Sequence, residues 1–174
     1  MDYPYETITY LARLSFRDAH GLDAVFDRYQ RLRVLAPELA TITQRVWGDG
    51  DPLHSFFSPS AELIDQRHEQ GKHRLTLALN KPASRGDEIE IYSTWRIHHG
   101  FKDRHGAWEF GPSTPHASAR VAIRFPIGRE PEGVTVDAST GTGSPFVSRP
   151  GTKELILNIK SPAIGSLYRI DWDW

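Results

Sequence analysis

Apolar and polar residues alternate with a period of two along much of this chain, and this pattern limits the folds open to it. In "DEIEIYSTWRI", Ile89, Ile91 and Trp95 fall on one face, while Glu88 and Glu90 fall on the other. Such alternation is typical of a β-strand that is buried on one side and faces water on the other. The stretches "ETITYLARLSF", "HRLTLAL", "ARVAIRF" and "KELILNI" repeat the pattern.

Turn-forming residues separate these alternating runs. Pro, Gly, Asn, Asp and Ser cluster in "NKPASRGD", "GPSTP" and "FPIGREPEG", where their backbone preferences end one strand before the next begins. Many short strands joined by turns predict an all-β fold, and we expect a two-sheet antiparallel β-sandwich. A length of 174 residues suits one domain, so we expect residues 1–174 to form a single sandwich domain.

The chain ends on "LYRIDWDW", in which Tyr168, Ile170, Trp172 and Trp174 share one face of an alternating run. An arginine and two aspartates occupy the other face. Chain ends are ordered when a packed element holds them in place, and large aromatic side chains gain most from burial. The pattern therefore predicts a C-terminal strand that packs its aromatic face into the core.

The segment at residues 22–36 fits two structures. Val25, Tyr29 and Leu32 have helical spacing, while Leu32 and Val34 alternate with arginines as they would in a strand. We favour the strand, and a short helical insertion near residues 22–36 stays open as the alternative.

Composition narrows the classes of function. Lys and Arg total 21 against 22 Asp and Glu, and this balance argues against proteins that bind nucleic acid through its phosphates or membranes through a basic patch. No apolar run approaches the roughly 20 residues of a membrane helix, and the N-terminus lacks the pattern of a signal peptide. The absence of cysteine excludes disulfides and thiolate sites. We expect a cytoplasmic protein.

The eight histidines raise the question of a metal site. "HEQGKH" holds His68 and His73, and "RIHHGFKDRHG" holds His98, His99 and His105. Adjacent histidines on a strand face opposite ways, and no pair has the spacing of a helical zinc motif. The sequence also lacks nucleophile and phosphate-loop motifs. We therefore expect no metal and no cofactor, and we favour a non-catalytic role while an enzymatic one stays open.

Aromatic and basic residues mix in "STWRIHHGFKDRHGAWEF". Trp95 and Trp108 fall on the apolar faces of two expected strands, so we assign both to the core. The connection between those strands is the best candidate for a recognition surface, because loops usually carry function on β-scaffolds and because aromatic and arginine side chains dominate binding energetics. The candidate binding residues are His98, His99, Phe101, Lys102, Arg104 and His105.

Three stretches together resemble a known group of domains. "RVWGDGD", the run from "RGDEIEIYSTWRIHHGF" to "RVAIRFP", and the closing "IKSPAIGSLYRIDWDW" are similar to immunoglobulin-like β-sandwich domains at the C-terminus of multidomain bacterial regulatory and conflict-system proteins. The resemblance covers residues 45–174 and includes no catalytic motif. It implies a non-catalytic sensing or interaction module that acts with a protein partner in a larger regulatory or defence assembly.

Two other functions stay open. One is a small metal-dependent or small-molecule-binding enzyme on a β-barrel, in which His68, His73, His98 or His105 would act with a carboxylate. The other is a structural module that forms homo-oligomers through an exposed strand edge.

The metal question has a direct test. Elemental analysis of the purified protein is expected to find no stoichiometric zinc, iron or manganese, because no two histidines have a convincing ligand spacing. One ion per chain would favour the enzyme.

Overall fold

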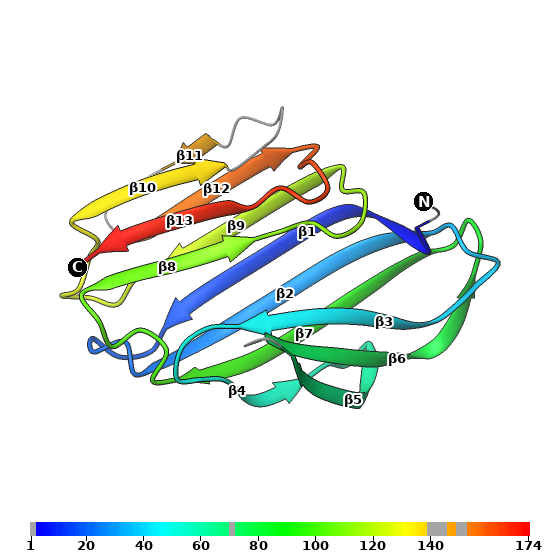
Figure 1. Cartoon of the computed structure of the whole chain (residues 1–174), viewed down its shortest axis with the longest axis horizontal. Coiled ribbons are helices and arrows are strands. Elements are labelled where there is room, and N and C mark those ends of the chain that lie inside the picture. Colours follow the sequence, from blue (N-terminus) through cyan, green and yellow to red (C-terminus); the bar gives the residue numbers. More distant parts are fainter. Residues whose placement is uncertain (1–2, 70–71, 139–145, 149–152) are drawn as a thin grey trace.

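The computed structural model describes residues 3–69, 72–138, 146–148 and 153–174, and strands run through all of this part of the chain (Figure 1). In chain order they are β1 (Tyr5–Phe16), β2 (Asp23–Val34), β3 (Glu38–Trp47), β4 (Asp51–Phe57), β5 (Ala61–Glu69), β6 (Lys72–Ser84), β7 (Glu88–His98), β8 (His105–Phe110), β9 (Ser118–Arg124), β10 (Gly133–Ala138), β11 (Phe146–Ser148), β12 (Glu154–Lys160) and β13 (Tyr168–Asp173).

The strands form three sheets. Sheet A has the order β11-β12-β9-β1-β2-β7-β4, sheet B the order β3-β6-β5, and sheet C the order β10-β13-β8. The expected all-β, sandwich-like fold is confirmed. The structure differs from two purely antiparallel sheets in having a third sheet and a parallel pair, β1 with β9, in which Tyr10 lies opposite Ala119. The described residues include no helix of the length and hydrophobicity needed to cross a bilayer.

The segment at residues 22–36 is a strand, so the alternative of a helical insertion there is wrong. β2 lies between β1 and β7 in the middle of sheet A, where Ala24, Phe26, Leu32 and Val34 are all buried. Residues at every second position of a strand point to the same face of the sheet, whereas in a helix these four side chains would point in several directions.

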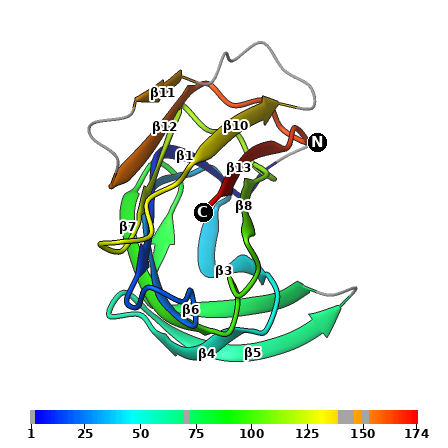
Figure 2. The ribbon, with the colours of Figure 1, turned by 90° about the vertical axis from the view of Figure 1, so that its left-hand side faces the viewer.

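The core lies on one face of sheet A, which sheets B and C cover side by side (Figure 2). Sheet A contributes aliphatic and aromatic side chains, among them Leu14, Phe26 and Ile123. Sheet B adds Leu75 and Leu77 from β6, and sheet C adds the apolar face of β13. The outer face of sheet A is richer in polar residues than the inner face, as the alternation predicts, although Leu11 on β1 is apolar and exposed there.

The C-terminal strand packs as the sequence predicts. In β13, Tyr168 and Ile170 are fully buried and Trp172 is 1% exposed. Gly106 on β8 lies directly opposite Trp172, and a Cβ at this position would lie 2.4 Å from the indole ring. Trp174 packs edge-on against Phe16, with ring centroids 4.8 Å apart. Sheet C is therefore joined to sheet A largely through the aromatic residues of the chain end.

Replacing Trp172 by Ala should destabilise the protein by about 3–5 kcal/mol, because it leaves a large cavity between two sheets. For a chain of this length the melting temperature should fall by about 6–20 °C. The matched control is Ile127→Ala, since Ile127 is 80% exposed and its truncation should have little effect. Equal melting temperatures for the two variants would contradict this packing of β13.

Candidate binding cleft

A cleft of about 1260 Å³ separates sheet B from sheet C. Its walls are β3 on one side and β8 on the other, and its floor is formed by the inner face of β1, β2 and β7. Figure 1 shows β1 and β2 passing between the two walls, and Figure 2 shows the two small sheets standing on the same side of sheet A. The cleft therefore lies where neither small sheet covers the large one.

Both walls are edge strands. β3 is the last strand of sheet B and β8 the last strand of sheet C, and within the described ranges neither has a ladder partner on its outer side. An edge strand directs alternate backbone N–H and C=O groups away from its sheet, where they can pair with another chain. Two such edges thus border the same cleft.

Buried amide and hydroxyl groups hold β3 over sheet A. The Gln44 amide donates to the side-chain oxygen of Gln30 on β2 at 3.2 Å. The Ser93 hydroxyl of β7 donates to the Gln44 oxygen, also at 3.2 Å. Gln44 and Ser93 are both buried, where a hydrogen-bonded polar pair favours one geometry over others. The position of this wall is therefore fixed by specific contacts.

Arg28 lies in the floor of the cleft and is only 8% exposed. Its guanidinium lies 4.8 Å from the ring centroid of Trp95 and 5.7 Å from that of Phe26. One Nη donates to the backbone carbonyl of Arg45 on β3 at 3.3 Å. Burial raises the pKa of the adjacent Tyr10 hydroxyl, and the charge and hydrogen bond of Arg28 offset only part of this rise.

The lining of the cleft carries more positive than negative charge. It includes six Lys and Arg side chains against three of Asp and Glu, although the whole chain has a net charge of −1. Glu109 and Arg169, one charge of each sign, pair with each other at 2.9 Å, so five cations and two acids of the lining are left outside this pair. A cleft with this balance attracts anions.

A hydrogen bond connects the two walls at one point. The Trp47 indole N–H at the end of β3 donates to the Glu109 carboxylate of β8 at 3.2 Å. Glu109 also accepts from Arg169, and the Lys72 ammonium lies 5.0 Å from the Trp47 ring centroid. These contacts set the distance between β3 and β8 beside Trp47.

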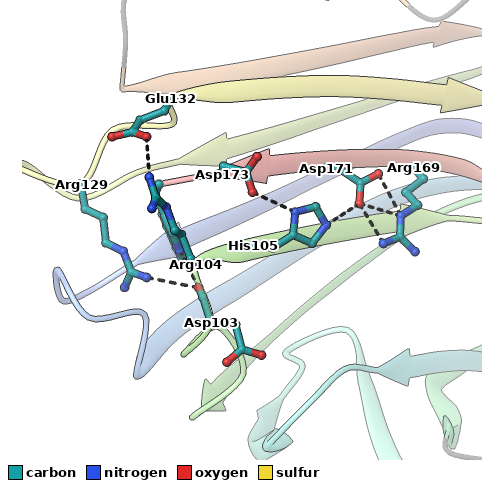
Figure 3. A network of polar contacts seen from close by, with 9 residues as sticks. Asp103, Arg104, His105, Arg129, Glu132, Arg169, Asp171 and Asp173 are labelled. Atoms are coloured by element: carbon teal, nitrogen blue, oxygen red, sulfur yellow. Dashed lines mark hydrogen bonds and ion pairs between the residues drawn. The ribbon is translucent and has the colours of Figure 1, made fainter.

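The outer face of sheet C carries a polar network beside the cleft (Figure 3). His105 bridges two carboxylates, with Nδ1 3.1 Å from Asp173 and Nε2 3.1 Å from Asp171. Arg169 donates to Asp171 through Nε at 2.8 Å. Hydrogen bonds to Asp173 and Asp171 raise the pKa of His105, while the Arg169 guanidinium lowers the pKa of the Asp171 carboxyl.

Four of the six candidate binding residues line the cleft, namely His99, Phe101, Lys102 and His105. His99 adopts a left-handed backbone conformation, with φ of 59°, and its N–H donates to the Leu22 carbonyl at 2.7 Å. Phe101 is partly buried and meets Phe16 edge-on, with ring centroids 4.9 Å apart. Phe101 therefore also serves the core.

The other two candidate residues lie outside the lining of the cleft. His98 stacks on His54 with ring centroids 3.7 Å apart, and its Nε2 lies 3.6 Å from Asp23. Arg104 pairs with Glu132 at 3.2 Å, as Figure 3 shows. A binding role for all six residues stays a prediction.

The structure does not bring together the four histidines of the enzyme alternative. His68 and His73 face each other across β5 and β6 in sheet B, whereas His98 belongs to sheet A and His105 to sheet C. Among the described residues, no group of three or more His, Asp or Glu side chains has an arrangement suited to a metal ion.

Sequence reasoning missed Arg28 and Gln30, although a signal was present. On the inner face of β2, these two residues interrupt the apolar series that runs from Ala24 to Val34. Polar residues at core positions of a strand need hydrogen-bond partners or a ligand. The interruption indicates a polar site over the middle of sheet A.

Comparisons with known proteins show the fold but no family. No protein-family model and no curated protein matches the chain. A protease candidate from Parabacteroides distasonis matches 98% of this chain with a TM-score of 0.58 at 9% identity. A two-domain M1 zinc metallopeptidase variant with bound L-tryptophan matches 98% with a TM-score of 0.50 at 13% identity.

This chain spans 40% of the first of these proteins and 43% of the second. At such low identities the likeness is one of fold alone: this all-β chain has the fold of a part of each of these two longer proteins. The resemblance to domains of bacterial regulatory proteins stays a prediction.

The His105 bridge should make stability depend on pH. The pKa of His105 is raised in the folded state, so the stabilisation by its charged form is complete below about pH 6.5, the ordinary value, and is lost as pH rises through the folded pKa. Thermal melts should show the largest difference between the wild type and His105→Gln below that pH, and a shrinking difference above it.

An NMR titration of the His105 ring gives an independent measurement. Asp173→Asn removes the carboxylate that raises its pKa most, so the pKa should fall in this variant. A wild-type His105 that titrates at or below the ordinary value would contradict the bridged geometry.

Proposed function

We propose that this chain is a non-catalytic binding module that receives an extended segment of a protein partner between β3 and β8. The observation that carries the proposal is the pair of edge strands that border one cleft over a polar and aromatic floor. A peptide that lies between them can form main-chain hydrogen bonds with either wall, which is the recognition mode known as strand addition.

The dimensions of the cleft suit a peptide better than a small molecule. Its volume of about 1260 Å³ exceeds the roughly 300–1,000 Å³ of ordinary small-molecule pockets. β8 has six residues, so its edge is about 20 Å long at roughly 3.4 Å per residue. An extended segment of about six residues would match this length.

The likeness to proteases supports a setting for this module. Those proteins are named for acting on polypeptides, and this chain resembles only two fifths of each. We infer that it works beside a catalytic partner or domain and contributes binding. The regulatory or defence assembly implied by the sequence resemblance is the other setting, and the fold comparison favours the peptidase.

Binding can be measured with a library of fluorescein-labelled random dodecapeptides and the full chain. Fluorescence anisotropy should identify peptides that bind, and hydrogen exchange should show new protection of backbone amides in β3 and β8, because strand addition pairs those groups. Binding without protection of either strand would contradict the proposed mode.

The matched control changes the peptide backbone and leaves its side chains intact. N-methylation of alternate residues removes the N–H donors along one edge of a bound strand. Two versions methylated in opposite registers should both bind at least tenfold more weakly if the peptide pairs with both walls. Unchanged affinity of both versions would overturn strand addition, and a library without any binding peptide would overturn the function itself.

A further inference from the structure

The charge of Arg28 lies inside the protein, and the described residues offer it no carboxylate partner. Arg28 is 8% exposed and lies on the inner face of β2, between Phe26 and Gln30. Within the part of the chain that the structure describes, no Asp or Glu oxygen lies within 4.0 Å of its guanidinium. Buried arginines are usually paired with an acid because an uncompensated charge is costly away from water.

The contacts of Arg28 use only part of its hydrogen-bonding capacity. The guanidinium has five N–H donors. One Nη donates to the Arg45 carbonyl, and the positive charge of the guanidinium acts to lower the pKa of the nearby Tyr10 hydroxyl. Nε is buried, and none of the described residues is its hydrogen-bond partner. The rings of Phe26 and Trp95 offset part of the charge through cation–π attraction. This attraction uses none of the N–H donors in the guanidinium plane, so several of them stay available for a ligand.

The surroundings favour an anion at this position. Arg28 forms part of the lining of the cleft, and the cations Arg45, Lys72 and Arg74 of β3 and β6 also line it. Their fields add at the floor and attract negative charge, while repelling a cationic segment. The planar guanidinium fork matches the two oxygens of a carboxylate, which can accept two parallel hydrogen bonds.

We infer that Arg28 is an anchor for a carboxylate carried by the bound peptide, so that the cleft selects acidic segments. This inference rests on the proposed peptide-binding function and adds the chemistry of the partner. The carboxylate comes either from an Asp or Glu side chain or from a chain terminus, because both present the same two oxygens.

Three labelled nonapeptides separate these sources. The first is Thr-Val-Thr-Val-Glu-Val-Thr-Val-Thr with a C-terminal amide, the second replaces its central Glu by Gln, and the third combines the central Gln with a free C-terminal carboxylate. The wild type should bind the first or the third about tenfold or more tightly than the second, as expected for a hydrogen bond between charged groups. Equal affinity for all three would overturn the inference while leaving the peptide-binding function intact.

Protein variants assign the preference to Arg28. Arg28→Met should abolish the discrimination between Glu and Gln peptides, and Arg28→Lys should retain a reduced preference because it keeps the charge without the fork. Arg31→Met is the matched control, since Arg31 lies on the same strand, is exposed and pairs with Glu88 at 2.8 Å. Thermal melts check that each variant is folded, and an unchanged preference in Arg28→Met would assign the effect elsewhere.

A measurement with acetate tests the site even if no peptide binds. In the ¹⁵N–¹H spectrum of the full chain, the Arg28 Nε–H signal should shift and saturate as acetate replaces chloride at constant ionic strength. The Arg31 signal should not saturate, because its fork already holds Glu88. If acetate leaves the Arg28 signal unchanged, Arg28 is not an anion site and the inference is wrong. If the signal saturates but no peptide binds, the anion site is retained and the peptide-binding function is rejected.

Discussion

Burial of the inner face of sheet A is the constraint on which the rest of this structure depends. As described, the sheet has seven strands. Its apolar inner face is stable only when another layer of secondary structure buries it away from water. Two sheets of three strands each provide this cover. Sheet C is fixed by the aromatic face of β13 around Trp172, and sheet B is fixed by the leucines of β6 and by Gln44.

Because two separate sheets, B and C, cover sheet A, a cleft lies between them. Each small sheet ends in an edge strand beside the cleft, so β3 and β8 bring two sheet edges, neither with a further ladder partner among the described residues, to the same space. The floor between them is the part of sheet A where Arg28 and Gln30 replace apolar residues. The polar floor and the free edges thus coincide, and together they suit an extended peptide with negative charge.

The sequence predicted the strands better than their arrangement. The face of β7 with Ile91 and Trp95 and the face of β13 with Trp172 follow from local alternation, which one segment displays by itself. The third sheet and the pairing of β1 with β9 depend on contacts between distant segments, which no local pattern encodes. The cleft was not predicted either, because it lies between strands that are distant in the sequence. A signal was present in Arg28, a charged residue on the apolar face of its strand.

The proposed binding site requires that β3 and β8, which are edge strands among the described residues, have free edges that border the cleft. Residue-resolved amide hydrogen exchange on the free protein measures whether these edges are free. Alternate amides of β3 and β8 should exchange rapidly, while amides of β1, β2 and β9 in the middle of sheet A should be strongly protected. Uniform protection along both β3 and β8 would mean that their edges are already paired, and it would rule out strand addition at this cleft.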